Sequence, residues 1–155
     1  MSTKRPIVNL ILQDKIWTKR VPSWKREVSC AFEKTAELLG KDFSETEVSV
    51  VLSSDEEVHV LNKTFRKMDK PTNVLSFPSE EQGELGDIIL AYETTMREAE
   101  TSGIPFLHHS LHLIIHGFLH LLGYDHENEE EAKEMEDIEI RILKGLHINN
   151  PYEDK

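Results

Sequence analysis

Three histidines, His116, His120 and His126, constrain the fold of this chain more than any other feature of its sequence. Residues four apart lie on one face of a helix, so His116 and His120 can point at a single metal ion. A third ligand one turn further along that helix would lie too far away, so the helix must end before His126. Gly123 stands where a left-handed cap would let the chain turn back. The spacing therefore predicts a helix, a turn and a three-histidine metal site.

Three imidazole ligands with an open fourth position are typical of a catalytic zinc site rather than a closed structural one. The same histidine spacing occurs in a class of zinc proteases, whose general base is a glutamate directly after the first histidine. Here that residue is Gly117, which cannot accept a proton. Peptide hydrolysis by that mechanism lacks its base, so we disfavour a metalloprotease. We expect one Zn²⁺ per chain at His116, His120 and His126.

Composition is that of an ordinary globular protein, and we expect residues 1–155 to form one domain. Apolar residues make up 38% of the chain and charged residues 30%. No apolar run approaches the roughly 20 residues of a membrane-spanning helix, and the N-terminus lacks the pattern of a secretory signal. The single cysteine, Cys30, excludes an internal disulfide, and we expect it in the core of a cytoplasmic protein. No membrane partner is expected.

The net charge of −11 is unevenly distributed, which matters for a nucleic-acid partner. Residues 1–75 hold 13 basic and 11 acidic side chains, a net +2, whereas residues 76–155 hold 5 and 18, a net −13. Because salt confines a local field to about 10 Å, a basic patch can bind phosphate even on an acidic protein. Charge alone neither supports nor excludes RNA. The acidic run between Glu127 and Glu139 is interpreted as the solvated face of a helix.

Hydrophobic periodicity predicts four short strands, followed mainly by helices. The strands are expected at residues 7–12, 48–52, 73–77 and 86–91. The helices are expected at residues 24–40, 54–65, 93–102, 108–122 and 128–145. This order indicates an α+β domain with a four-stranded mixed sheet packed against helices. Because the helix at 108–122 is apolar on nearly every face, the zinc site should lie on a central, buried helix.

A second informative stretch, residues 61–78, holds four basic side chains within eight positions: Lys63, Arg66, Lys67 and Lys70. Arg66 could bind a phosphate through both arms of its guanidinium and offset charge that develops on it. The lysines have a simpler explanation as solvated cations at a helix end. Phosphate binding and plain solvation both stay open for this cluster.

Two further residues near the predicted metal site have open roles. His112 lies one turn before His116 and cannot reach the same ion along a straight helix, so it should not be a ligand. It is expected to be a hydrogen-bonded core histidine; the alternatives are a role in the hydrogen-bond network behind the metal ligands and a substrate-facing role. Asp87, inside an apolar strand, could orient a ligand imidazole or could satisfy backbone groups beside Gly86.

Residues 112–126, 61–78 and 85–88 resemble three motifs of the bacterial YbeY family, which are metal-dependent endoribonucleases. With the order of elements, the resemblance covers nearly the whole chain, although residues 1–45 carry no diagnostic motif. It implies cleavage of single-stranded RNA, maturation of the 3′ end of small-subunit ribosomal RNA, ribosome quality control and action in the cytoplasm. It also implies that the three histidines are the zinc ligands and that Arg66 acts in RNA cleavage.

The expected function is therefore that of a zinc-dependent endoribonuclease. Single-stranded RNA, ribosomal RNA and the small ribosomal subunit are its expected partners, and DNA is not. Arg66, Lys67 and Lys70 are the expected RNA-binding residues. The alternative is a non-catalytic, ribosome-associated module that zinc stabilises. Two reaction routes stay open. Phosphorus is attacked either by water that the metal activates or by the 2′-hydroxyl of the RNA. Only attack by the 2′-hydroxyl leaves a 2′,3′-cyclic phosphate.

Overall fold

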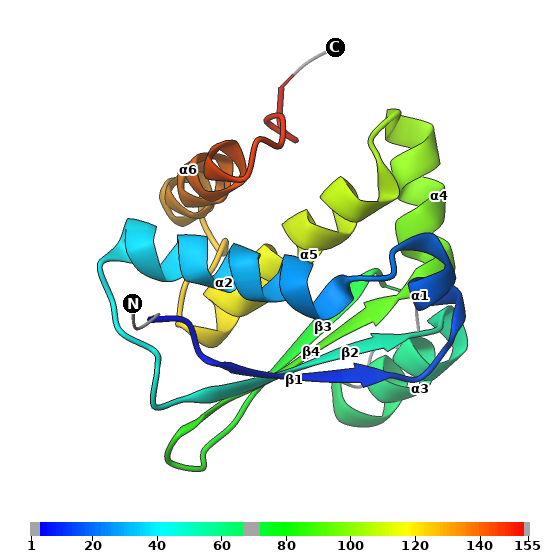
Figure 1. Ribbon diagram of the computed structural model, residues 1–155, viewed down its shortest axis with the longest axis horizontal. Coiled ribbons are helices and arrows are strands. Elements are labelled where there is room, and N and C mark those ends of the chain that lie inside the picture. Colours follow the sequence, from blue (N-terminus) through cyan, green and yellow to red (C-terminus); the bar gives the residue numbers. More distant parts are fainter. Residues whose placement is uncertain (1–3, 67–71, 154–155) are drawn as a thin grey trace.

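The computed structural model describes residues 4–66 and 72–153. Four strands form one sheet in the order β1-β2-β4-β3 (Figure 1). They are β1 Ile7–Leu12, β2 Glu47–Ser53, β3 Val74–Pro78 and β4 Glu84–Ala91. Strands β1 and β4 run parallel to β2, whereas β3 runs antiparallel to β4. The predicted α+β class and four-stranded mixed sheet are confirmed.

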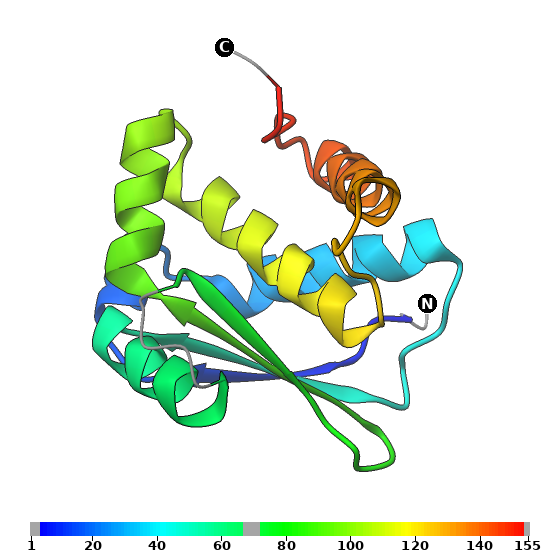
Figure 2. The same ribbon diagram turned by 180° about the vertical axis from the view of Figure 1, so that it is seen from behind.

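Helices cover both faces of this sheet. They are α1 Ile16–Arg20, α2 Trp24–Leu39, α3 Asp55–Arg66, α4 Tyr92–Ser102, α5 Phe106–Leu121 and α6 Glu129–Gly145. Figure 1 shows α2 and α5 on one face and α3 on the other, an arrangement seen from behind in Figure 2. Helix α6 packs against α2 and α5. No helix among the described residues is both long and apolar enough to cross a membrane.

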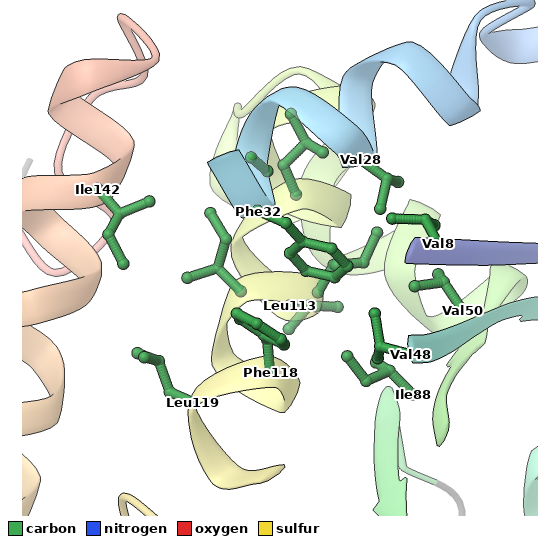
Figure 3. Packing of buried hydrophobic residues seen from close by; sticks show 14 of the residues in the cluster. Val8, Val28, Phe32, Val48, Val50, Ile88, Leu113, Phe118, Leu119 and Ile142 are labelled. Carbon is green, nitrogen blue, oxygen red and sulfur yellow. The ribbon is translucent and has the colours of Figure 1, made fainter. Parts of the chain in front are cut away.

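The strands contribute to two hydrophobic cores because successive side chains of a strand point to opposite faces. Val48 and Val50 of β2 face α2 and α5, whereas Val51 faces α3. In the larger core, Phe32 of α2 stacks on Phe118 of α5 with ring centroids 4.4 Å apart (Figure 3). Full burial of such a side chain contributes about 1.5–3 kcal/mol. This core fixes α5 over the sheet.

Helix α5 approaches the sheet closely at Gly117. A Cβ atom at this position would lie 2.9 Å from Cγ2 of Ile88 and 3.2 Å from the hydroxyl oxygen of Ser76. The Ser76 hydroxyl donates a hydrogen bond to the carbonyl of Gly117 at 3.3 Å. The helix that carries two of the predicted ligands is therefore held directly against β3 and β4. Its predicted central, buried position is confirmed.

The C-terminal end of α5 has the glycine cap that the sequence predicts. Gly123 adopts a φ of +102°. Its N–H donates to the carbonyl of His120, and the N–H of Tyr124 donates to the carbonyl of Leu119, both at 3.0 Å. These two bonds form a Schellman motif, whose positive φ glycine adopts without steric cost. The chain therefore leaves the helix axis just before His126.

In the first third of the chain, one expectation was wrong and one helix had not been predicted. Cys30 is exposed on α2 rather than buried. The helix buries Val28, Ala31 and Phe32, and position 30 falls on the opposite side of its turn. The short helix α1 was not predicted, because five residues are too few to show a helical period. It buries Trp17, whose indole N–H donates to the Ser53 carbonyl at 2.9 Å.

Candidate metal centre

The three predicted ligands converge at the C-terminal end of α5. One ring nitrogen each of His116, His120 and His126 lies within 4.8 Å of the others, so that the three could hold one metal ion. His116 and His120, one helical turn apart, bring their Nε2 atoms to 3.1 Å. His126 follows in the loop after α5, where its backbone N–H donates to the Asp125 carboxylate at 2.8 Å. The predicted convergence of the imidazoles is confirmed.

The hydrogen bonds of two imidazoles determine which nitrogens carry protons. Nδ1 of His116 donates to Oε2 of Glu139 at 2.7 Å, and Nδ1 of His120 donates to the carbonyl of Tyr124 at 3.0 Å. Carboxylate and carbonyl oxygens only accept, so both Nδ1 atoms are protonated. When both rings are neutral, both Nε2 atoms carry lone pairs, and these lone pairs face each other. A cation bound by both nitrogens removes this repulsion.

The spacing of these nitrogens fits a zinc ion. Tetrahedral zinc with Zn–N bonds of about 2.0–2.1 Å places two ligand nitrogens about 3.3 Å apart. The observed separation of the Nε2 atoms of His116 and His120 is 3.1 Å. Neutral imidazole is also a ligand that zinc favours, and three such ligands leave one coordination position for water or substrate. The donor set and its protonation therefore suit a catalytic zinc ion.

Glu139 of α6 is the site residue that sequence reasoning missed. Its side chain is fully buried. It accepts hydrogen bonds from Nδ1 of His116 at 2.7 Å, from Nε2 of His112 at 2.7 Å and from the hydroxyl of Tyr152 at 2.5 Å. The interpretation of the acidic run as a solvated face is wrong for this residue. A signal was available, because Glu139 lies between Met135 and Ile142 in the buried stripe of α6.

Hydrogen bonding keeps this buried carboxylate charged. Burial raises the pKa of Glu139, but the bonds from His112 and His116 outweigh burial, and the pKa falls from its ordinary 4.5 to about 2. Burial, and then the bond to Glu139, raises the pKa of Tyr152, so its phenol stays protonated and donates. Burial, and then the nearby His116, lowers the pKa of His120. That lowered pKa keeps His120 neutral and able to bind a metal.

His112 belongs to the hydrogen-bond network around the metal site and not to the ligand cluster. Its Nε2 bonds to Glu139 and lies 3.2 Å from the hydroxyl oxygen of Tyr152. Its Nδ1 is buried and has no hydrogen-bond partner in the described part of the chain. The expectation of a hydrogen-bonded histidine that is not a ligand agrees with this position.

Asp87 does not orient an imidazole. It is exposed, and it lines a separate hollow of about 270 Å³ with Asn9 and Ser49. The neighbouring Ile88 points into the larger core beside α5. Because strand side chains alternate, Asp87 lies on the opposite face of the sheet from the three histidines.

The three histidines open into a cleft of about 980 Å³ whose walls come from α3, β3, α4, α5 and the C-terminal segment. The stretch 61–78 contains the predicted RNA-binding residues Arg66, Lys67 and Lys70. It borders this cleft through Asn62 and through residues 72–76. Arg66 is the last residue of α3, and its side chain lies outside the described part. Lys67 and Lys70 also lie outside the described residues.

Comparisons with known proteins identify the family of this chain. A family model described as endoribonuclease YbeY matches residues 11–147. The chain belongs to the YbeY endoribonuclease family. Family membership confirms the resemblance seen in the sequence, and with it the expected class of enzyme, an endoribonuclease.

Two YbeY relatives match over most of their length. The endoribonuclease YbeY of Bradyrhizobium diazoefficiens is 44% identical over 160 residues, which cover 97% of this chain and 87% of the relative. The Rhodopseudomonas palustris endoribonuclease YbeY is 46% identical over 156 residues, with coverage of 96% and 82%. The solution structure of TM1509 from Thermotoga maritima is similar in fold, with a TM-score of 0.60, 27% identity and coverage of 96% and 97%.

Most of the candidate metal centre lies within the part that the YbeY model matches. The three histidines and Glu139 fall between residues 11 and 147, whereas Tyr152 follows that range. The Tyr152 hydroxyl nevertheless bonds to Glu139 in the centre of the network. The C-terminal segment therefore adds a residue to a site that the family-matched part otherwise forms.

Proposed function

We propose that this chain is a zinc-dependent endoribonuclease that cleaves single-stranded RNA. One observation carries the proposal: three imidazoles of a YbeY family member converge in a large cleft, and two of them bring their Nε2 atoms to 3.1 Å of each other. His116, His120 and His126 would hold the ion. When bound, zinc supplies a Lewis acid for a phosphoryl oxygen and lowers the pKa of a coordinated water.

The protein's own groups prepare the ligands for this role. Glu139 holds the proton of His116 on Nδ1, which leaves Nε2 free to coordinate and adds negative charge behind the ligand. The carbonyl of Tyr124 fixes the ring of His120 in the same tautomer. Helix α6 positions the carboxylate of Glu139, and the capped end of α5 positions the carbonyl of Tyr124. The two ligands on α5 are therefore preorganised.

We place Arg66 as the residue that binds the scissile phosphate and offsets charge developing on it. Its backbone lies one helical turn after Asn62, which lines the cleft. A guanidinium offers two parallel donors to a phosphate and keeps its charge at any working pH. Lys67 and Lys70 would add weaker, salt-dependent contacts to the RNA backbone.

The proposed substrate is single-stranded RNA, and within the cell ribosomal RNA. A single strand can turn a base out into a cleft of this size, whereas a duplex presents mainly its backbone and a shallow groove. The resemblance to the YbeY family further supports 3′-end maturation of small-subunit ribosomal RNA, ribosome quality control and partnership with the small subunit in the cytoplasm. Residues 1–155 would act as one catalytic domain.

The proposal can be tested with single-stranded and duplex RNA of one sequence, each incubated with purified protein with and without chelator. We expect cleavage of the single strand alone, loss of cleavage with chelator and recovery with added zinc. Cleavage that survives complete removal of metal would refute the zinc mechanism. Equal cleavage of the duplex would refute the strand preference. A 2′,3′-cyclic phosphate at the product end would assign the attack to the 2′-hydroxyl.

A second experiment separates the enzyme from a zinc-stabilised module. His126 is exposed in a loop, so His126→Ala should abolish cleavage while the thermal unfolding transition stays close to that of the parent. His108→Ala, on the same helix as two ligands but outside the cluster, is the matched control and should cleave normally. Global unfolding of the His126 variant would favour the structural module instead.

A further inference from the structure

The last described turn of the chain brings an aromatic ring into the cleft. After α6, the chain passes the first half of α5, where Ile148 and His108 line one small hollow, and Ile148 is buried in the larger core. Tyr152 then lines the cleft that contains the three histidines. Its backbone N–H donates to the side-chain oxygen of Asn150 at 2.8 Å, which closes a local turn. The segment is thus anchored at Ile148 and again at Tyr152.

Two contacts hold the Tyr152 ring in one orientation. Its hydroxyl donates to the buried carboxylate of Glu139 at 2.5 Å. Its ring meets the ring of His112 nearly at a right angle, with centroids 5.4 Å apart. Tyr152 nevertheless remains 41% exposed. The polar end of this ring is anchored and the rest of its surface is open. Because the ring is already ordered, it can bind a flat ligand at little entropic cost.

The neighbouring charges favour an uncharged ligand group at this ring. The charges that act on this ring are the carboxylate of Glu139, which accepts its hydroxyl proton, and that of Glu136. Such carboxylates would repel an RNA phosphate but not a nucleobase. Single-stranded RNA is commonly held by bases that stack on aromatic side chains, whichever base is present.

We propose that Tyr152 is a nucleobase-binding residue, whose ring stacks on one base of the bound single-stranded RNA. The inference rests on the proposed endoribonuclease function and extends it to a base subsite. That subsite lies after residue 147, beyond the part of the chain that the YbeY family model matches.

Three variants separate the ring from its hydroxyl. Tyr152→Phe keeps the ring, Tyr152→Leu removes it, and Leu38→Ala removes a side chain of similar exposure, 40%, from α2. The affinity of each zinc-loaded protein for a labelled single-stranded RNA is measured by stopped-flow anisotropy before cleavage. We expect binding about 5- to 150-fold weaker for Tyr152→Leu. Leu38→Ala should bind within about twofold of the parent. Tyr152→Phe keeps the ring but loses the bond that orders it, so its affinity should lie between those of the parent and Tyr152→Leu.

Equal weakening in Tyr152→Phe and Tyr152→Leu would overturn the proposal, because the hydroxyl and not the ring would then matter. Parent-like binding by Tyr152→Leu would overturn it as well. If the leucine variant loses its zinc, Tyr152→Trp decides instead: a larger ring without a hydroxyl should bind RNA at least as tightly as the parent, and weaker binding contradicts stacking.

An RNA series with one abasic nucleotide at each successive position adds an independent test. At one position, loss of the base should weaken binding to the parent but should not weaken binding to Tyr152→Leu any further. If no position behaves in this way, the base subsite is refuted. The two proposals fail differently. A parent protein that binds RNA through this ring but never cleaves it refutes the nuclease alone, whereas a parent that cleaves RNA and does not depend on the ring refutes the subsite alone.

Discussion

Replacement of Glu139 by glutamine tests whether a buried carboxylate sets the metal affinity of this centre. The side chain is fully buried and accepts three hydrogen bonds. Glutamine has the same shape but one acceptor oxygen, and its other terminal atom is a donor. With the oxygen kept on His116, the amide N–H groups face His112 and Tyr152. The hydroxyl of Tyr152 can accept a hydrogen bond from the amide, and Nε2 of His112 can do so after its proton moves to Nδ1. The fold should therefore survive.

The expected loss follows from the charge behind His116. Substitution of a residue that hydrogen-bonds a metal-binding histidine typically weakens metal affinity about 10- to 100-fold. That range corresponds to about 1.4–2.7 kcal/mol. We expect a loss of this size for Glu139→Gln in competition with a chromophoric chelator at neutral pH. Without metal, the free energy of unfolding should fall by about 1.5–3 kcal/mol, the contribution of one hydrogen bond to a charged group.

Glu134→Gln is the matched control, because it makes the same substitution at an exposed position of α6. It should change neither zinc affinity nor the free energy of unfolding. If Glu139→Gln binds zinc as tightly as the parent and the control do, the carboxylate does not support the ligand, and the network is only structural.

The remaining predictions concern the ligands, the basic cluster and pH. His116→Ala/His120→Ala should lower the zinc content from about one per chain to none by elemental analysis, and tight zinc binding by this variant would contradict the site. Arg66→Ala and Arg66→Lys should slow single-turnover cleavage about 100- to 1,000-fold while zinc stays bound. Parent-like cleavage by Arg66→Ala would show that Arg66 is not catalytic. Lys67→Ala and Lys70→Ala should weaken RNA binding mildly and in a salt-dependent way. Zinc affinity should fall as pH drops through the histidine range, because protonated imidazole cannot coordinate. Since folding lowers the pKa of Glu139 from 4.5 to about 2, its contribution to stability is full above about pH 4.5 and is lost towards pH 2. Acid unfolding followed by circular dichroism should therefore be less steep for Glu139→Gln, and an equally steep curve would argue against this assignment.

Features encoded by local spacing could be predicted from the sequence. The first strand spans Ile7–Leu12 as expected, and α5 ends at its glycine cap. The pairing of His116 with His120 depends only on the helical repeat. Gly123 then explains how His126 can return to the same place. Each of these inferences concerns residues within about two helical turns of one another, where backbone geometry decides the outcome.

Features that depend on the packing of distant elements could not be predicted in this way. The bond between His116 and Glu139 joins residues 23 positions apart, through the contact of α5 with α6. The sequence showed only an acidic residue within an apolar stripe. Tyr152 reaches His112 across 40 positions, and no periodic pattern marks it. Asp87 was within reach of local reasoning, because the inward position of Ile88 already placed its neighbour on the outer face.

The contact of Gly117 with the sheet separates two enzyme chemistries that share one histidine spacing. A single base change in a glycine codon can produce glutamate, the general base of the zinc proteases that share this histidine spacing. In this fold, a side chain at position 117 would begin 2.9 Å from Ile88 and 3.2 Å from Ser76. A glutamate there would press into the sheet and lift α5 from β3 and β4, carrying two of the three imidazoles with it. The packing of one helix thus leaves no room for the glutamate base that the histidine spacing alone would admit.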